Sequence, residues 1–152
     1  MAFYNSVVNA KLYIGTSTAV PLPAYGSDTF TEVPLLSSIT PPPNEQAVSF
    51  FSILNDANKR SLAGKLGDRL CEGSLVIDWT QSVHTSMYSD SVTAGGVKRN
   101  WRIVYPDTGN RQLDFAATLN KWTEEPFDAG EDAKEHRASF SLAVDGAITV
   151  TP

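Results

Sequence analysis

The sequence predicts a mainly β protein: an antiparallel β-sandwich or distorted barrel of about seven strands with one flanking α-helix. Apolar and polar residues alternate with a period of two in several segments, which is the pattern of a half-buried strand. Turn-forming residues separate these segments at short intervals, so consecutive strands can pair as antiparallel neighbours. Only one stretch of the chain is followed by a stop signal that favours a helix.

The N-terminal part of the chain contains two predicted strands with a loop between them. Residues 10–16 alternate apolar and polar side chains and predict the first strand. Residues 17–32 are rich in Ser, Thr, Pro and Gly and are expected to be largely loop. Residues 33–39 predict the second strand, and because Pro34 cannot donate a ladder hydrogen bond, we expect it at a sheet edge. Three prolines at 41–43 end this strand and are interpreted as a stiff spacer, not as a ligand for an SH3-type domain.

The middle of the chain combines an apolar strand with a polar excursion. Residues 46–54 are apolar on both alternating faces, so we expect this strand to be covered on two sides, by its own core or by another subunit. Residues 55–73 are polar and punctuated by glycine, and they are interpreted as an extended loop or hairpin arm. A strand is predicted to resume at residues 74–79.

The C-terminal half predicts the helix and a hairpin. The helix is expected over residues 81–94, with Gly95-Gly96 as its stop. Residues 99–105 and 111–122 predict strands, and the turn residues at 106–110 indicate that these strands form a hairpin.

The end of the chain predicts an acidic loop at residues 123–132 and strands at residues 138–144 and 147–151. Between these strands lies Asp145-Gly146, which favours a two-residue hairpin but fits equally well with a kink or bulge in one long strand. The sequence leaves both interpretations open.

Composition places the chain among soluble, single-domain proteins. A length of 152 residues suits one domain over residues 1–152, and 41% hydrophobic with 19% charged residues is typical of a folded protein. No apolar run is long enough to span a membrane, and the N-terminus lacks the pattern of a signal peptide. The single cysteine, Cys71, excludes an intrachain disulfide. Acidic residues outnumber basic ones 17 to 12, and the net charge of −5 argues against a dedicated nucleic-acid binder.

No residue pattern indicates an enzyme, a cofactor or a metal site. Neither His84 nor His136 has a second ligand at a metal-binding spacing, so both are interpreted as ordinary polar positions. The chain has no G-x-S-x-G element, no P-loop and no dinucleotide fingerprint. The acidic residues at 124–135 do not follow the alternating ligand pattern of a calcium loop and are expected to be solvated. We therefore expect a non-enzymatic protein without cofactors.

Four aromatic residues leave one alternative open. They are Tyr88, Trp101, Tyr105 and Trp122. Aromatic side chains on a β-sandwich can stack on sugars, which makes a carbohydrate-binding module the alternative from a different functional class. Trp101 and Trp122 lie within strand patterns, where aromatic residues more often fill cores and subunit contacts, so a carbohydrate-binding role is the second choice.

Four segments occur in a recognisable order: AKLYIG at 10–15, ILNDANKRSLAGKLGDRLCEGSLVIDW at 53–79, RNWRIVYPD at 99–107 and the stretch from LDFAATLNKW to the end at 113–152. In this order they resemble the major tail tube protein of bacteriophages with long, non-contractile (siphovirus-type) tails. In the middle segment, the family's pattern corresponds to Asp56, Lys59 or Arg60, Gly64, Asp68 and Gly73. The spacing from Asp68 to Gly73 is longer than in the family's pattern. The C-terminal part resembles the family in its Tyr-Pro-Asp hairpin, in Pro126 and in its closing strand at 146–150.

The resemblance implies a structural virion protein whose copies form hexameric rings that stack into a hollow tail tube. One sheet would contribute to a barrel around the lumen, with the helix outside. The implied partners are further copies of the chain, a tape measure protein in the lumen, tail terminator and tail tip proteins, and DNA that passes without specific binding. The protein would be assembled in the host cytoplasm and reside in the virion tail. The inner tube of a contractile tail or of a secretion system shares this architecture and is the alternative within the same class.

Two segments are expected to contact other subunits: an N-terminal arm at residues 1–9 and the arm at residues 55–73. The candidate interface residues are Phe3, Tyr4, Val7, Val8, Phe50, Phe51, Arg60, Lys65 and Arg69. A ring of six copies, each with a net charge of −5, would carry −30, and acids that face the lumen would then repel passing DNA.

Overall fold

The computed structural model describes residues 10–43, 46–51, 60–66, 69–106, 109, 111–127 and 135–152, and for 46–51 and 60–66 it describes the backbone. In chain order, the described elements are β1 (Lys11–Gly15), the 3-10 helix η1 (Tyr25–Ser27), β2 (Phe30–Glu32), β3 (Leu36–Thr40), β4 (Gln46–Phe51), β5 (Arg60–Leu66), β6 (Leu70–Val76), α1 (Ser82–Val92), β7 (Lys98–Val104), β8 (Gln112–Glu124) and β9 (Arg137–Thr151).

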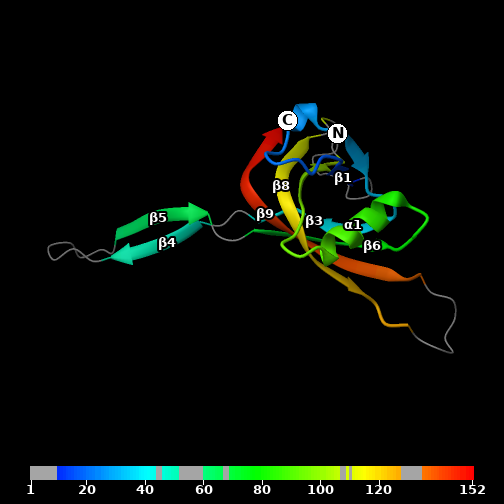
Figure 1. The fold of residues 1–152 in the computed structure, drawn as a ribbon. Coiled ribbons are helices and arrows are strands. Elements are labelled where there is room, and N and C mark those ends of the chain that lie inside the picture. Colours follow the sequence, from blue (N-terminus) through cyan, green and yellow to red (C-terminus); the bar gives the residue numbers. More distant parts are fainter. Residues whose placement is uncertain are drawn as a thin grey trace, which may run out of the picture.

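Seven of these strands form one antiparallel sheet, in the order β2-β1-β7-β8-β9-β6-β3 (Figure 1). The long strands β8 and β9 pair along most of their length and curve, so the sheet curls into two halves that face one another. One half contains β2, β1, β7, the beginning of β8 and the end of β9, and the other contains β3, β6, the beginning of β9 and the end of β8. The predicted class, a mainly β fold with one helix, is confirmed.

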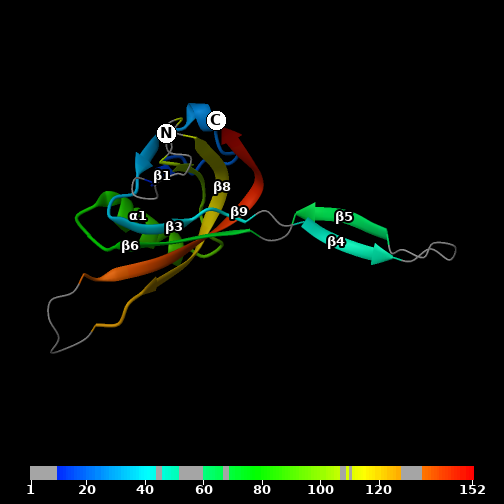
Figure 2. The ribbon, with the colours of Figure 1, turned by 180° about the vertical axis from the view of Figure 1, so that it is seen from behind.

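Strands β4 and β5 pair only with each other among the described strands (Figures 1 and 2). Both views show this two-stranded unit, here called the β4–β5 arm, apart from the seven-stranded sheet. The prediction placed a strand at 46–54 and an arm at 55–73, whereas the pairing joins residues of both segments in one hairpin-like unit. A two-stranded unit without a packed face has little stability of its own.

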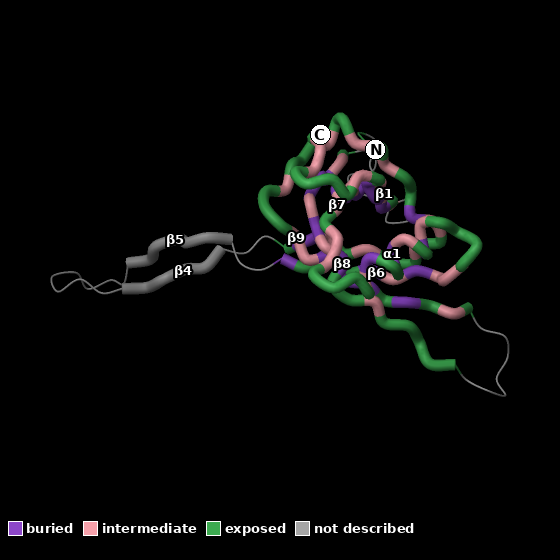
Figure 3. The backbone as a smooth tube through the Cα atoms, in the orientation of Figure 1, coloured by how far each residue is buried: buried purple, intermediate pink, exposed green. Residues whose placement is uncertain are grey.

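Apolar side chains from both halves of the sheet meet in one core. Figure 3 marks the buried positions along the backbone in purple. The largest fully buried side chains are Leu12, Trp101, Ile103 and Phe115 from the first half, Leu75, Leu119 and Leu142 from the second, and Met87 from α1. Each buried side chain of this size contributes about 1.5–3 kcal/mol relative to an exposed one. Because the core residues of each strand occupy alternate positions, the period of two in the sequence is a consequence of this core.

Strand β9 is continuous through Asp145-Gly146, so the kink is correct and the hairpin is not. Gly146 has a φ of +82°, a left-handed conformation that glycine adopts without steric cost. Close by, the register between β8 and β9 shifts between Asp114 and Ala116. The glycine and the bulge together let β9 turn from one half of the sheet into the other.

Two strands begin or lie where they were not expected. Strand β6 begins at Leu70 instead of residue 74, because residues 70–73 already pair with β9, and it ends at Val76, which leaves Trp79 outside the strand. Strand β2 lies in the segment expected to be loop; its three residues form an edge beside β1. Strand β3 ends at residue 40, just before the three prolines, and takes the predicted edge position.

The helix α1 ends as predicted, ahead of Gly95 and Gly96, which both have positive φ. His84 on this helix is fully buried, so its interpretation as an ordinary polar position is incomplete. Its Nδ1 accepts a hydrogen bond from the Asp78 backbone N–H at 3.0 Å, and its Nε2–H donates to the Pro34 carbonyl at 2.8 Å. These bonds attach α1 to the turn that precedes β3.

We predict that the Cys71 thiol is unreactive in the folded protein and that the stability of the protein falls at alkaline pH because of it. Burial raises the pKa of Cys71 to about 12, with a smaller contribution from the charge of Glu72. Because the folded pKa exceeds the unfolded one of about 8.5, this contribution to stability is complete below pH 8–9 and is lost as the pH rises toward 12. A thiol reagent should label Cys71 only at denaturant concentrations that unfold the chain. The free energy of unfolding should fall less steeply above pH 9 in Cys71→Ala than in the parent, and parallel curves would contradict this assignment.

Gly73 is predicted to be needed for the close approach of β3 to β6. A Cβ at Gly73 would lie 2.7 Å from Cζ of Phe140 and 2.8 Å from the backbone oxygen of Ser38. Gly73→Ala should therefore lower the free energy of unfolding by about 1–3 kcal/mol, measured by denaturant titration. Gly26→Ala is the matched control, because a Cβ at Gly26 meets nothing within 4 Å. Equal stability of the two variants would show that β3 is not held as closely as described.

Candidate assembly surfaces

One half of the sheet ends in two unpaired strand edges. Strand β7 pairs with β8 only as far as Lys98 opposite Thr118, so residues 119–124 of β8 have β9 as their single partner among the described strands. At the other side, β3 pairs with β6 alone. We call this half, made of β3, β6, residues 137–143 of β9 and residues 119–124 of β8, the open layer. Its two edges expose backbone N–H and C=O groups that can pair with another strand.

The two open edges run in opposite directions. Each neighbouring pair in the series β3, β6, β9 and β8 is antiparallel, so the first and fourth strands of the open layer are antiparallel to each other. When identical copies are placed side by side by rotation, the β3 edge of one copy therefore meets the β8 edge of the next in antiparallel orientation. The edges are complementary in direction, as a repeating antiparallel sheet requires.

The outer face of the open layer is lined by hydroxyl groups. Two cross-strand rows form it: Lys121, Ser141, Glu72 and Thr40 in the first, and Thr123, Ser139, Ser74 and Ser38 in the second. Together with Gly73 and Phe140, these residues line a shallow groove of about 490 Å³. We call this surface the hydroxyl face. It contains six hydroxyl groups, one acid and one base, so its described residues are balanced in charge.

The hydroxyl face has few internal partners for its polar groups. The Oγ atoms of Ser38 and Ser74 lie 2.8 Å apart and share a hydrogen bond. Ser141 is 5% exposed, and its Oγ has no hydrogen-bond partner among the described residues. The opposite face of the same strands carries the core residues Cys71, Leu75 and Leu142. Of the two faces of the open layer, the hydroxyl face is therefore the one that the core does not cover.

Three aromatic residues form a partly exposed cluster beside the open edge of β8. Trp79 follows β6, Tyr88 lies on α1 and Trp122 lies on β8. Their ring centroids are 5.5 Å apart for Trp79 and Tyr88, 6.4 Å for Trp79 and Trp122, and 6.3 Å for Tyr88 and Trp122. We call these three residues the aromatic cluster. The prediction had named Tyr88 and Trp122 but not Trp79, which was expected inside a strand.

Polar contacts hold the elements that carry the aromatic cluster. The carboxylate of Asp78 accepts from the Thr80 hydroxyl at 2.6 Å and from the Thr80 backbone N–H at 3.0 Å, and these bonds keep the pKa of Asp78 below its usual range. They fix the turn that contains Trp79. Trp101 is buried in the core, as expected for an aromatic residue within a strand.

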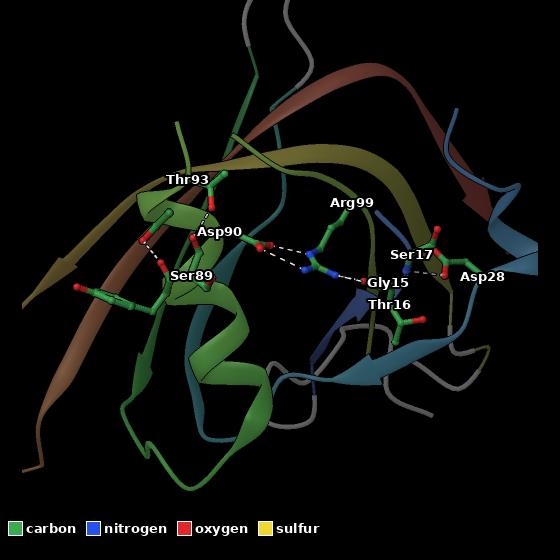
Figure 4. A network of polar contacts seen from close by, with 10 residues as sticks. Gly15, Thr16, Ser17, Asp28, Ser89, Asp90, Thr93 and Arg99 are labelled. Carbon is green, nitrogen blue, oxygen red and sulfur yellow. Dashed lines mark hydrogen bonds and ion pairs between the residues drawn. The ribbon is translucent and has the colours of Figure 1, made fainter. Parts of the chain in front are cut away.

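An ion pair joins α1 to β7, in the half of the sheet that also contains β1 (Figure 4). Arg99 Nε donates to Asp90 Oδ2 at 2.6 Å, and both side chains are largely buried. The same guanidinium lies 3.3 Å from the carbonyl oxygens of Gly15 and Thr16 at the end of β1. With the His84 contacts at its first turn, α1 is anchored at both ends and holds Tyr88 in place.

The predicted interface residues lie mostly where side chains are not described. Phe3, Tyr4, Val7 and Val8 fall outside the described residues, and Phe50, Phe51, Arg60 and Lys65 lie on β4 or β5, whose backbone alone is described. Arg69 is buried, and its guanidinium donates to the carbonyl of Gly146 on its own chain. The backbone N–H of Val144 donates to the Arg69 carbonyl at 3.0 Å. Arg69 therefore has an established role in joining the start of β6 to the kink in β9.

The sequence contained a signal for the hydroxyl face that was not used. Ser or Thr occurs at alternate positions in two segments of the open layer, at 38 and 40 and at 139 and 141, and the other two strands carry a charged residue and a hydroxyl residue at alternate positions, Glu72 with Ser74 and Lys121 with Thr123. Alternation of this kind marks a solvated sheet face as clearly as alternating apolar residues mark the core. Within the described ranges, no three His, Cys, Asp or Glu side chains are placed to hold a metal ion. No described helix has both the length and the apolar composition needed to cross a membrane.

Solved structures of tail tubes and related assemblies share this fold. A chain in the sheath/tube terminator of the PVC extracellular contractile injection system superposes with a TM-score of 0.74 at 11% identity, covering 100% of this chain and 99% of that chain. A chain from the tail of an empty gene transfer agent (GTA) particle, determined with C6 symmetry, superposes with a TM-score of 0.62 at 16% identity, covering 93% of this chain and 96% of that chain. The SPP1 tail tube superposes with a TM-score of 0.63 at 11% identity, covering 93% of this chain and 75% of that chain.

The sequence matches no known family profile and no curated protein. At these low identities, the structural likeness establishes the fold. The chain has the fold found in tail tube and tube terminator proteins of phage-like particles.

Proposed function

We propose that this chain is a tube subunit of a bacteriophage tail, whose copies form hexameric rings that stack into a hollow conduit for DNA. The observation that carries the proposal is the open layer, with two unpaired edges of opposite direction, a core on one face and hydroxyl groups on the other. Pairing of the β3 edge of one copy with the β8 edge of the next would satisfy the backbone groups of both edges. Such a head-to-tail contact closes into a ring when the rotation closes.

The bulk of the protomer determines which face of the ring points inward. The core side of the open layer is covered by the other half of the sheet and by α1, so it cannot lie inside a narrow ring. The hydroxyl face would therefore line the bore. Six copies of a four-stranded layer give 24 strands, and at a spacing of about 4.8 Å these form a circumference of at least about 115 Å. Barrels of 16–18 strands already leave an open channel, so this ring would be open as well.

Six copies are proposed because one structural neighbour is a GTA tail determined with C6 symmetry. The proposed partners are the neighbouring copies, a tape measure protein in the lumen, and terminator and tip proteins at the tube ends. The β4–β5 arm, together with the N-terminal residues 1–9, is assigned to contacts between rings, because a two-stranded unit gains stability when a neighbour covers it. The protein would reside in the virion tail.

A non-contractile tail is the version that the sequence resemblance favours, and the SPP1 tail tube is among the structural neighbours. The inner tube of a contractile system is the alternative. A tube terminator is a second candidate function, because a terminator chain matches this chain over its full length. A terminator would stop at a single ring, whereas a tube subunit elongates, so electron microscopy of the purified protein separates the two.

The seam between copies can be tested by pairing cysteines at the two open edges. Thr40→Cys with Lys121→Cys, or Ser38→Cys with Thr123→Cys, places one thiol on each edge in the same cross-strand row. Within one copy the two positions are three strands apart, about 14 Å, which is too far for a disulfide. Mild oxidation of assembled protein should therefore give a covalent ladder that ends at six copies on a non-reducing gel.

The single variants Thr40→Cys and Lys121→Cys are the controls, and neither should give more than a dimer. Tubes that form without a ladder from either pair would disprove the seam while leaving the tube intact. Concentrated protein that stays monomeric would disprove the proposed function itself.

The charge of the bore is predicted to affect DNA passage. Glu72 is the acid that the described part of the hydroxyl face contributes, and Glu72→Lys would place a ring of positive charges beside passing phosphates. DNA release from particles that carry Glu72→Lys should be slower than from the parent, in a manner that added salt relieves. Glu32→Lys, an exposed charge reversal on β2 in the other half of the sheet, is the matched control. Unchanged release from intact Glu72→Lys particles would show that Glu72 does not face the DNA.

A further inference from the structure

We infer that the aromatic cluster is the docking site for the β3 strand of a second copy of this chain, and that it supplies much of the energy of the seam. The inference rests on the proposed function, because it concerns the same contact between neighbouring copies. It names the side chains that would determine the strength of that contact, beyond the backbone hydrogen bonds of the strand edges.

The first observation is exposure. Trp79 is 50% exposed and Tyr88 is 42% exposed, although both contact each other and Trp122. Aromatic side chains bury about 150–250 Å² each when covered and dominate the energetics of interfaces. Three clustered rings with two of them half exposed therefore form a surface that gains stability from a protein partner.

The second observation is the position of the cluster at the open edge. Trp122 lies in the part of β8 that has one strand partner, and in register it lies opposite Phe140, which is opposite Gly73, which is opposite Ile39. All four positions share the core side of the open layer. A strand added at the β8 edge would continue this row, so its core-side residues would lie next to Trp122 and its neighbours Trp79 and Tyr88.

The third observation identifies the occupant. The strand edge that runs in the complementary direction is β3, whose core-side residues Leu36 and Ile39 are partly buried hydrophobic residues. Leu35, in the turn immediately before this strand, has a φ of +57° and is 51% exposed. A neighbouring β3 would thus bring apolar side chains to the aromatic cluster on one face. On the other face its hydroxyl groups would extend the rows of the hydroxyl face, so the two faces match across the seam at once.

The geometry of the rings argues for a protein partner over a sugar. Tyr88 meets Trp79 at an interplanar angle of 82° and Trp122 at 78°, both edge-to-face arrangements. The third pair, Trp79 and Trp122, is tilted at 38°, so the three rings do not share one plane on which a sugar ring could stack. Apolar side chains such as Leu and Ile fit an irregular aromatic surface of this kind.

The test compares Trp79→Ala with Phe127→Ala. Trp79 lies in a turn, so its truncation should leave the fold intact, which a thermal melt of the monomer verifies. Phe127 is an aromatic residue of 85% exposure that stacks on His136 outside the cluster. We expect Trp79→Ala to raise the critical concentration for assembly by about tenfold or more, as truncation of an interface hot spot does. Phe127→Ala should assemble like the parent, and Trp79→Phe should recover most of the loss.

A second measurement follows the cluster directly. Acrylamide should quench the fluorescence of the parent monomer through the exposed Trp79 and should quench the assembled protein much less. If cysteine-linked rings form while Trp79 remains as open to quenching as in the monomer, the inference is wrong and the proposed function stands. If Trp79→Ala assembles normally but loses binding to a glycan that the parent binds, a sugar is the occupant and the inference is wrong. If the parent protein never assembles, both the proposed function and the inference are wrong.

Discussion

The rest of the structure depends on the continuous pairing of β8 with β9. These two strands are the only described ones that belong to both halves of the sheet, and they pair from Gln112 opposite Thr151 to Glu124 opposite Ala138. The kink at Gly146 and the register shift near Ala116 allow this ladder to turn without losing its partners. The β8–β9 pairing therefore closes the core and also extends beyond it. At its far end, β8 continues past the last residue that pairs with β7.

This overhang leaves the open layer of one protomer with unpaired edges among the described strands. The core needs only the inner faces of the two halves, so it leaves the edges of the open layer unpaired and its outer face solvated. A monomeric protein would be expected to shorten or cover such edges, because they invite pairing with other chains. Here the edges have complementary direction, the outer face repeats the same hydroxyl rows on four strands, and aromatic side chains flank the seam. These features are consistent with one another if the working form is a closed ring.

Those features that depend on residues close together in the chain could be predicted from the sequence. The first strand, the helix with its glycine stop and the hairpin of β7 and β8 follow from local periodicity and turn residues. The edge position of β3 was expected from Pro34, but Pro34 lies in the turn before β3, so the edge is a property of the sheet topology. Long-range pairing decided the rest. Asp145-Gly146 suits a turn and a kink equally, and only the β8 partner selects the kink. Likewise the start of β6 carries Cys71 and Gly73 on its inner face, which give no apolar alternation although both are buried.

The predicted interface residues stay a prediction, because most of their side chains lie outside the described part of the chain. Subunit contacts were expected from the N-terminal arm and from the arm at 55–73, on the basis of apolar and basic residues, whereas the described structure directs attention to backbone edges that no single residue reveals. An open edge depends on where the neighbouring strand ends, as β7 does at Lys98, and this is a property of the topology. Trp79 was missed because its segment was expected to remain in a strand that ends at Val76.

The central claim is that other copies of the chain complete the open layer. Amide hydrogen exchange tests it most directly, because it reports the pairing of backbone N–H groups at each edge in the monomer and in the assembled protein. The relevant amides are those of β3 and of residues 119–124 whose N–H groups point away from their own strand partner. The account predicts that these amides exchange quickly in the monomer and slowly after assembly. The exchange of amides in β2, at the other edge of the sheet, should change little. Assembled protein in which both edges of the open layer exchange as quickly as in the monomer would contradict it.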